Sequence, residues 1–467
     1  MSREESSPSG RSDDPERNEL HLAWKREARD ATTKSERAFR GWELLRENGV
    51  DLLAIRETGE VYACHGGVWR ADGEQVLREK ARQMMASEYS TAVFRELREQ
   101  VRTTSSIPTD ELGTPRGTAA VGNGLLDLRD RSLRELRPED HALSRYPVDY
   151  ESGASCPRWR TFLDSVVGDE SGRSQLQEFV GYCLAGGDPW LKKALMIFGP
   201  TDAGKTVFLD IVERLFGEEA NAAQTPQYLA NQRWGVHQLA GNPVNIRHDV
   251  DAERLQTLGV LKEVIDGNPV TAEQKGKNPY TFRPQTRHLF AANRAPKRPV
   301  DDEAFWNRWL TVTFPDSVPP EEQDPKPKLL GELTGELPGI LNWALDGLDR
   351  LRGKGEFTDA PTPDENRRRW EQYGTPIERF KSVCLDKEPG EWVRKDIVRS
   401  ALADFCADRG HEQPSNQKLS RVLLNDPEIG KTQKRVDGGK PRVYTGIRLS
   451  EGCPHWIGGE TIVSDSR

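Results

Sequence analysis

The sequence predicts an α/β core that lies between a largely helical N-terminal region and a small C-terminal domain of helices and a hairpin. Short apolar segments alternate with helical and loop segments from about residue 190 to residue 316, which is typical of an α/β fold. Helical periodicity dominates the residues before this stretch. After it, two helical segments precede an alternating segment with a Gly-Gly pair at its centre.

The N-terminal region begins with a charged, polar stretch that predicts a disordered tail. A polar helix is expected over 19–47, a hairpin in "EVYACHGGVWRA" and further helix over about 73–102. The Thr, Ser, Pro and Gly content of "TTSSIPTDELGTPRG" predicts a linker. In "AAVGNGLLDLRD", Asn123-Gly124 is a candidate for a type I′ turn.

Seven segments follow from these patterns. They are a disordered tail (1–18), an α+β region (19–118), a helical domain before the core (119–189), the α/β core (190–316), a helical extension and linker (317–369), a winged-helix-like domain (370–450) and a tail (451–467).

The segment "FGPTDAGKTVFLDIV" begins the core and satisfies the phosphate-loop pattern G-x-x-x-x-G-K-[ST]. A buried-strand candidate, "ALMIF", precedes it, and an amphipathic helix follows. Glycines let backbone N–H groups surround phosphate oxygens, the lysine reaches the β- and γ-phosphates, and the hydroxyl binds Mg²⁺. The residues expected to bind ATP are Gly199, Pro200, Thr201, Asp202, Ala203, Gly204, Lys205 and Thr206.

Three residues after the loop supply what an ATPase of this kind needs. Asp249 follows the short strand in "NPVNIRHDVD" and is expected to hold Mg²⁺ with Thr206, although a plain polar loop is the alternative. Asn293 ends the apolar strand of "TRHLFAANRAP"; it could orient water, or serve only as a turn former. Arg308, just before a strand in "AFWNRWLTVTF", could face the phosphate of a neighbouring subunit, or be an ordinary surface residue.

The C-terminal segment predicts a winged helix. "WVRKDIVRSALADFCADRG" is expected to form one helix, "SNQKLSRVLLND" a second helix capped by Ser415, and "KTQKRVDGGKPRVYTGIRL" a hairpin around Gly438-Gly439. The hairpin carries basic residues able to contact a phosphate backbone. They are Lys431, Lys434, Arg435, Lys440 and Arg442. A helical hairpin docked on the core is the alternative.

Composition narrows the class of protein. The formal net charge is −8, so any DNA contact depends on the local placement of Lys and Arg. No apolar run is long enough for a membrane span and no secretory signal is present, so a cytoplasmic protein is expected. The six cysteines make no C-x-x-C pair, which argues against a zinc ribbon.

Taken in order, these motifs resemble a superfamily 3 helicase of the phage, plasmid and poxvirus-type primase–helicase family. The resemblance covers about residues 120–450 and includes "NGLLDLRDRSLRELRP", "LQEFVGYCLAG", "LKEVIDGNPVTAEQKGKNPYTFRPQTRHLFAANRAP", "DDEAFWNRW" and "ELPGILNWALDGL". It implies an AAA+-like core in which Lys205 and Thr206 bind ATP–Mg²⁺ and Asp249 is the Walker B acid. Asn293 would be the sensor and Arg308 the arginine finger.

The resemblance also implies partners. The family forms hexameric rings, in which Lys275 and Lys277 of "AEQKGKNPYTF" would contact single-stranded DNA in the channel, while the winged helix would bind duplex. We therefore expect an ATP-driven DNA helicase that replicates a virus, provirus or plasmid. The alternative is a nucleotide-switched initiator or loader that does not unwind DNA. Primase activity is not expected from this chain, so a separate primase is a possible partner.

The chain departs from the family pattern in two places. Gly267-Asn268 stands where the family often has Gly-Asp, and the strand before Asp249 is less apolar than usual. Neither departure removes a catalytic group.

Overall fold

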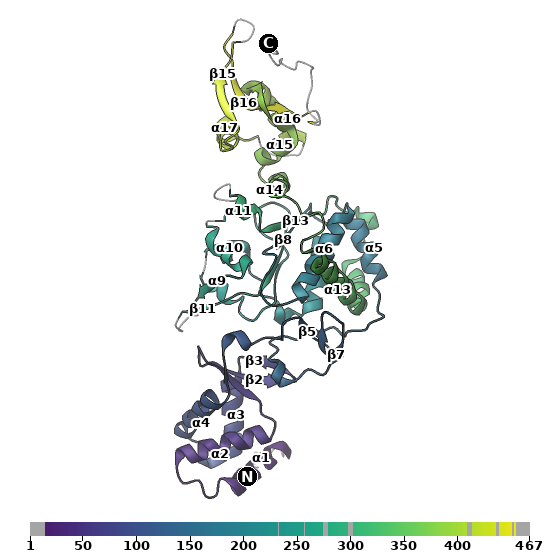
Figure 1. Ribbon diagram of the computed structural model, residues 1–467. Coiled ribbons are helices and arrows are strands. Elements are labelled where there is room, and N and C mark those ends of the chain that lie inside the picture. Colours follow the sequence, from purple (N-terminus) through teal and green to yellow (C-terminus); the bar gives the residue numbers. More distant parts are fainter. Residues whose placement is uncertain are drawn as a thin grey trace, which may run out of the picture. The chain divides into compact units, whose positions relative to one another are not determined.

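The computed structural model describes residues 15–231, 233–255, 257–273, 279–297, 302–408, 413–435, 439–450 and 453 (Figure 1). The chain divides into two compact units, Met1–Asp149 and Tyr150–Arg467. This boundary falls inside the segment 119–189 that the sequence groups as one helical domain. Residues 119–149 contain strands and belong to the first unit, whereas the helices that follow belong to the second.

The first unit combines a helical cluster with two small sheets. The order of the larger sheet is β3-β2-β1-β4, and that of the smaller is β5-β6-β7. Apolar residues of the four helices, with β1 and β2, form one buried cluster that includes Trp24 and Trp42. The helices are α1 (Pro15–Glu27), α2 (Lys34–Glu47), α3 (Gly73–Met85) and α4 (Thr91–Thr104). The strands are β1 (Leu52–Ile55), β2 (Val61–His65), β3 (Val68–Arg70), β4 (Ser106–Ile107), β5 (Thr118–Val121), β6 (Gly124–Asp127) and β7 (Leu133–Arg134).

Three local predictions for this unit need correction. The single helix expected over 19–47 is two helices, because Thr33 forms a capping box that starts α2. The expected linker contains β4, which pairs in parallel with β1. The prediction of a turn at Asn123-Gly124 is also wrong. Gly124 pairs with Val121 inside the hairpin, so the two loop residues are Gly122 and Asn123.

The core of the second unit is a four-stranded sheet in the order β13-β8-β12-β9, with every pair parallel. All residues of β8 and β12 are buried, as expected for the central strands of a parallel sheet that is covered on both faces. The strands are β8 (Ala194–Phe198), β9 (Val244–Arg247), β12 (Arg287–Ala292) and β13 (Trp309–Thr313).

Helices surround this sheet. Helix α6 packs on β13 and along α13 (Figure 1). Helix α7 packs on β9 and β12. Glycines allow the close approach of α6 and α13, since a Cβ on Gly181 would lie 2.4 Å from the carbonyl oxygen of Ala344. The helices are α5 (Pro157–Val166), α6 (Glu170–Leu184), α7 (Lys205–Phe216), α8 (Pro226–Asn231), α9 (Arg233–His237), α10 (Gly259–Asp266), α11 (Glu303–Trp306), α12 (Lys326–Gly335) and α13 (Leu337–Lys354). A separate antiparallel pair consists of β10 (Val270–Ala272) and β11 (Tyr280–Phe282).

The C-terminal part of the second unit has its own buried cluster, which includes Phe380, Phe405 and Tyr444. Its antiparallel sheet has the order β14-β16-β15. The elements are α14 (Pro363–Gln372), α15 (Pro376–Cys384), β14 (Leu385–Arg394), α16 (Lys395–Asp408), α17 (Asn416–Leu424), β15 (Gly430–Gln433) and β16 (Arg442–Leu449). Short 3₁₀ helices lie elsewhere in the chain, at Ala86–Glu88, Thr109–Glu111, Pro138–Asp140, Glu218–Ala220 and Pro320–Glu322.

The C-terminal elements differ from expectation in one respect. Trp392, Val393 and Arg394 were expected to begin a helix, but they lie in β14, where they pair with β16. The helix therefore begins at Lys395. The side chain of Ser415 accepts a hydrogen bond from the backbone of Lys418, as its predicted capping role requires. The expected Gly438-Gly439 turn lies partly outside the described residues.

Within the described residues, we find no helix with the length and apolar character needed to cross a membrane.

Candidate functional site

The loop between β8 and α7 adopts a backbone that requires glycine at both ends. Gly204 has φ 86°, a left-handed conformation, and a Cβ there would lie 2.8 Å from Val166. A Cβ on Gly199 would lie 2.4 Å from the carbonyl oxygen of Phe314. The segment after β13 braces the loop, because the backbone N–H of Val318 donates to the carbonyl of Asp202 over 3.0 Å. The segment after β13 therefore supports the loop from outside the β8–α7 unit.

Lys205, the first residue of α7, folds back into this loop. Its Nζ donates to the carbonyl oxygens of Gly199 (2.9 Å) and Pro200 (2.5 Å), and the residue is only 5% exposed. Burial lowers the pKa of Lys205 to about 8, while the negative charges of Asp249 and Asp202 act to raise it. The ammonium group therefore lies inside the loop, within reach of both carboxylates' fields. Thr206, beside it, is exposed.

The register of the parallel sheet aligns the ends of three strands. Ala292 of β12 is opposite Phe198 of β8, so Asn293 and Gly199 follow at the same level. On the other side of β12, the backbone N–H of Val250 donates to the carbonyl of Ala291, which carries the segment after β9 to the same edge. Asp249 and Asn293 are both exposed. The carboxyl ends of β8, β12 and β9 thus bring the loop, Asp249 and Asn293 together.

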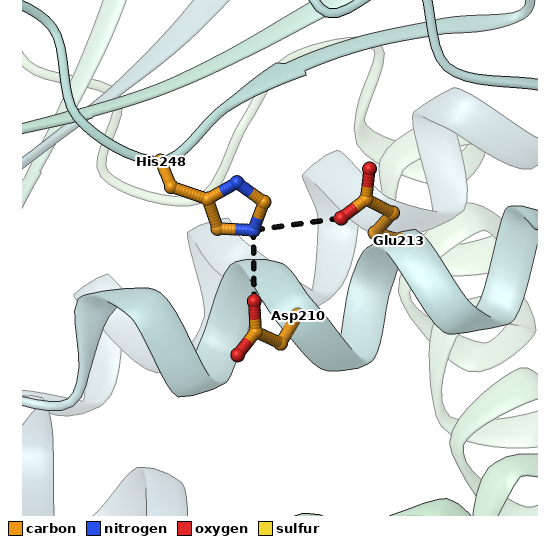
Figure 2. A group of neighbouring side chains, drawn as sticks. All are labelled: Asp210, Glu213 and His248. Carbon is orange, nitrogen blue, oxygen red and sulfur yellow. Dashed lines mark ion pairs between the residues drawn. The ribbon is translucent and has the colours of Figure 1, made fainter. Parts of the chain in front are cut away.

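His248 ties the segment that carries Asp249 to helix α7. Its Nε2 lies 3.0 Å from Oδ1 of Asp210 and 3.6 Å from Oε2 of Glu213, two residues on one face of α7 (Figure 2). Burial acts to raise the pKa of Asp210, but interactions with His248 and Lys326 outweigh it, so this pKa lies below its usual value. Sequence reasoning missed His248 because its partners on α7 precede it by 38 and 35 residues.

The group of Asp210, Glu213 and His248 has the donor types of a metal site, but its charges already have partners. Nζ of Lys326 lies 3.0 Å from Oδ2 of Asp210, and the side chain of Asn221 donates to Oε1 of Glu213 over 2.6 Å. We therefore interpret the group as a link between α7 and β9. The oxygen donors that suit Mg²⁺ at the loop are the exposed hydroxyl of Thr206 and the carboxylate of Asp249.

Arg308 lies at the amino ends of the strands, opposite the carboxyl ends that carry the loop. It precedes β13, whose first residue, Trp309, is opposite Ala194 at the start of β8. The length of β8, at about 3.3 Å per residue, separates this edge from the loop. The guanidinium binds the carboxylate of Asp266 through Nε (2.8 Å) and Nη2 (2.6 Å). Within one chain, the structure does not bring Arg308 to Lys205, Asp249 and Asn293.

A cavity of about 350 Å³ opens beside the loop, and sequence reasoning missed its far wall. Pro200 and Asn293 line one side, and residues of the C-terminal elements, among them Tyr373 and Arg379, line the other. No local motif marks Arg379, because only the packing of α15 places it here.

The basic residues expected to contact DNA are partly described. Lys431, Arg435, Lys440 and Arg442 are exposed, and Lys434 is half-buried with its Nζ 5.1 Å from the ring centroid of Trp392. Lys395 joins them from the start of α16: burial, then the charges of Lys431 and Arg442, lower its pKa. Lys275 and Lys277 lie outside the described residues, between the paired strands β10 and β11.

Two family models match parts of this chain. Residues 43–168 match the model described as D5 N terminal like, and residues 197–308 match a family of unknown function (DUF5906). The first match supports the coarser part of the expectation, a relationship with the phage- and virus-type primase–helicase family. It does not reach the finer assignment to superfamily 3 helicases. No curated protein matches the chain.

Solved structures of the NrS-1 C-terminal region are similar to this chain over most of its length. Two apo forms cover 87% of this chain and 98% of their own, at 9% identity and TM-scores of 0.45 and 0.46. Scores at this level carry no argument about fold or function.

Proposed function

We propose that the chain is an ATP-driven DNA helicase of the superfamily 3 type, with an AAA+-like core, which acts in the replication of a virus, provirus or plasmid. The observation that carries this proposal is the alignment of three strand ends. It groups a phosphate loop, an acidic residue and an amide at the carboxyl edge of one parallel sheet. In open parallel sheets, ligands bind outside the carboxyl ends of the strands.

Each residue at the carboxyl ends of these strands has its own role in the proposed ATP hydrolysis. Mg²⁺-ATP supplies the reactive γ-phosphoryl group and the positive charge of the metal. The N–H groups of the loop and Lys205 bind phosphate oxygens, for which Lys205 gives up its bonds to Gly199 and Pro200. Thr206 and Asp249 would hold the metal, and Asp249 would polarise the attacking water that Asn293 orients.

Arg308 would act in a neighbouring subunit of a homo-hexameric ring. Its place at the amino edge of the sheet keeps it from the loop of its own chain. In a ring it would leave Asp266 and stabilise the transition-state charge on the next subunit's ATP. The position of this pair at the far end of β8 supports an action in trans.

DNA would be contacted at two places. Lys275 and Lys277 would bind the phosphates of a single strand in the channel. The hairpin of β15 and β16, with Lys395 beside it, would lie against duplex DNA as the wing of a winged helix. A separate primase would supply primers, because we do not assign primer synthesis to this chain.

A strand-displacement assay on a forked DNA tests the proposal. Unwinding is expected with ATP and Mg²⁺, and none with a non-hydrolysable analogue or with the Lys205→Ala variant. Particle images should show six-membered rings. Hydrolysis without displacement on any fork would rule out a helicase.

A nucleotide-switched initiator or loader is the second candidate, and the Arg308–Asp266 ion pair favours it. Both side chains are largely buried, with 21% and 7% exposed, so releasing the arginine breaks a buried ion pair. A protein that switches slowly tolerates this cost better than a motor that must release the arginine in every cycle. Such a protein would bind DNA differently with ATP and ADP but displace no strand.

A further inference from the structure

Polar side chains hold the strand that leads to Asp249. This strand, β9, is the last of its sheet, and its outer edge has no strand beside it but the side chain of Asn221. Oδ1 of Asn221 accepts from the backbone N–H of Ile246 over 2.8 Å, and Nδ2 donates to the carbonyl of the same residue over 3.3 Å. The fully buried Asn245 is held in the same way by the backbone of Gln224, over 2.6 and 3.0 Å. The polar residue that makes β9 less apolar than the family pattern therefore helps to fix the strand.

Helix α7 supplies two carboxylates to this arrangement. Oε1 of Glu213 accepts a hydrogen bond of 2.6 Å from Nδ2 of Asn221. One turn earlier on the helix, Oδ1 of Asp210 lies 3.0 Å from Nε2 of His248, the residue before Asp249 (Figure 2). An imidazole carries a proton on Nε2 in the cation and in one neutral tautomer, so the contact can form in both charge states. The helix that begins at the phosphate loop thus holds β9 and the segment after it at two points.

The spacing of the residues relates this contact to the candidate metal ligands. Thr206 and Asp210 are four residues apart on α7, so their side chains lie on one face of the helix. On the facing segment, His248 and Asp249 are consecutive residues. The contact between Asp210 and His248 therefore lies one helical turn, about 5.4 Å, from Thr206 and one residue from Asp249. It limits how far the two candidate ligands can separate.

A further ion pair fixes the orientation of the Asp210 carboxylate. Nζ of Lys326, on α12, lies 3.0 Å from Oδ2 of Asp210, while His248 lies beside Oδ1. The two oxygens of this carboxylate thus have partners on different elements, which restricts its rotation. The side chains of Asp210 and His248 are 22% and 29% exposed, and ion pairs at such exposure contribute little to stability. We therefore expect the contact to direct Asp249 rather than to hold the fold together.

We propose that His248 is a positioning residue for the metal site: through its contact with Asp210, it holds Asp249 at the spacing from Thr206 that Mg²⁺ bound to ATP requires. The inference rests on the proposed function, because it takes Thr206 and Asp249 as the metal ligands. It gives the group of Asp210, Glu213 and His248 a role in metal binding that acts through Asp249 and needs no metal of its own. Residues that support metal ligands typically change metal affinity or activity by about 10- to 100-fold when they are removed.

The test measures equilibrium binding of a non-hydrolysable ATP analogue to the full chain, once with Mg²⁺ and once with EDTA. Mg²⁺ should raise the affinity of wild-type protein. His248→Ala should lose about tenfold or more of the affinity in Mg²⁺ and keep the affinity in EDTA, because only the metal depends on the placement of Asp249. His248→Gln, whose amide can still donate to Asp210, should lose less. The matched control is Arg247→Ala, an exposed neighbour on β9, which should behave as wild type in both conditions.

A double-mutant cycle shows whether His248 acts through Asp210. Asp210→Ala should reproduce the loss of Mg²⁺-dependent affinity, and the double variant should lose no more than the weaker of the two single variants, because each change removes the same contact. Losses that add in the double variant would show that the two residues act separately and would overturn the inference.

The remaining outcomes separate the inference from the proposed function. Equal losses in Mg²⁺ and EDTA for His248→Ala, or no loss, would overturn the inference and leave the proposed function standing. If Mg²⁺ does not raise the affinity of wild-type protein, or if Asp249→Ala binds as wild type in Mg²⁺, the metal ligands of the proposed function fail and the inference fails with them. Normal Mg²⁺-dependent binding without strand displacement would contradict the helicase alone. Should His248→Ala not fold, His248→Gln and His248→Asn decide by the same ratio of affinities.

Discussion

The two ends of β8 carry similar side chains in contrasting surroundings. Lys193, before the strand, donates to the carbonyl of Asn307 over 2.5 Å, and Lys205, after the loop, donates to two loop carbonyls. Burial lowers the pKa of both lysines. Beside Lys205 the neighbouring strand ends present an exposed carboxylate and an exposed amide. At the same end of the strands as Lys193, Arg308 is already neutralised by Asp266.

On the proposed function, the contrast is one between a binding edge and a supporting edge. At the amino edge, the strong donors have carboxylate or carbonyl partners fixed by the fold. At the carboxyl edge, the ammonium of Lys205 is held by neutral carbonyls that a phosphate would outcompete, because charge-assisted hydrogen bonds are the stronger ones. Similar side chains therefore have fixed partners at the amino ends of the strands and exposed polar neighbours at the carboxyl ends.

Replacing the two lysines should give the largest difference between the edges. Lys205→Ala is expected to abolish ATP turnover and weaken ATP binding by about a hundredfold or more, because the β- and γ-phosphates lose their cation. Lys193→Ala should keep the ATP affinity of wild type. Equilibrium binding and phosphate-release assays measure both. Equal losses in the two variants would show that the edges are not functionally distinct.

Arg308 and Asp266 test whether the amino edge is only structural. If Arg308 acts on the next subunit, Arg308→Ala should lower turnover about a thousandfold while ATP binding persists. Asp266→Ala, which frees the same arginine, should keep turnover. Steady-state hydrolysis and nucleotide binding separate these cases. Parallel losses of turnover and thermal stability in both variants would instead assign the pair a purely structural role.

The two asparagines that border strands offer a milder comparison. Asn293 follows β12 at the carboxyl edge, and Asn307 precedes β13 at the amino edge; both are exposed. Asn293→Ala should reduce turnover about a hundredfold, the usual cost of one oriented polar group at a reacting centre. Asn307→Ala should leave it unchanged, since its backbone carbonyl still accepts from Lys193. Single-turnover hydrolysis checks the pair.

The smallest expected effect is a pH dependence confined to the carboxyl edge. On the proposed function, the charged form of Lys205 binds phosphate, and burial lowers its pKa to about 8. ATP affinity should therefore be constant below this pH and fall by up to about tenfold per unit above it, because binding must then take up a proton. Calorimetry at pH 7, 8 and 9 measures the trend. Lys205→Arg should remove it, as a guanidinium stays charged throughout.

Local chemistry explains what could be predicted from the sequence. The strand, loop and helix around Lys205 depend on adjacent residues. Asn293 follows a short apolar run, and Asp249 follows a short strand in which polar residues alternate with Val244 and Ile246. The loop, Asp249 and Asn293 come together because the carboxyl ends of parallel strands lie at the same end of the sheet. By contrast, the partner of Arg308 is at the end of α10, a helix whose position along the sheet has no sequence pattern.

The wrong predictions also have a physical cause, since strand pairing overrode local preference. Trp392–Arg394 has a helical pattern, yet β16 supplies it with strand partners. The Asn123-Gly124 pair favours a turn, but Gly124 is drawn into pairing with Val121. Arg379 and Lys395 reach their neighbours through the packing of α15 and α16, which no single segment of sequence encodes.

The hold of the loop on Lys205 also has a consequence for chemical reactivity. An amine whose pKa is about 8 is unprotonated in roughly a tenth of molecules at pH 7, far more than an ordinary lysine. The unprotonated amine is the nucleophile. Acylating reagents small enough to enter the loop should therefore modify Lys205 ahead of the exposed lysines that surround it. Bound nucleotide should protect it, so modification of Lys205 becomes a covalent marker of nucleotide binding.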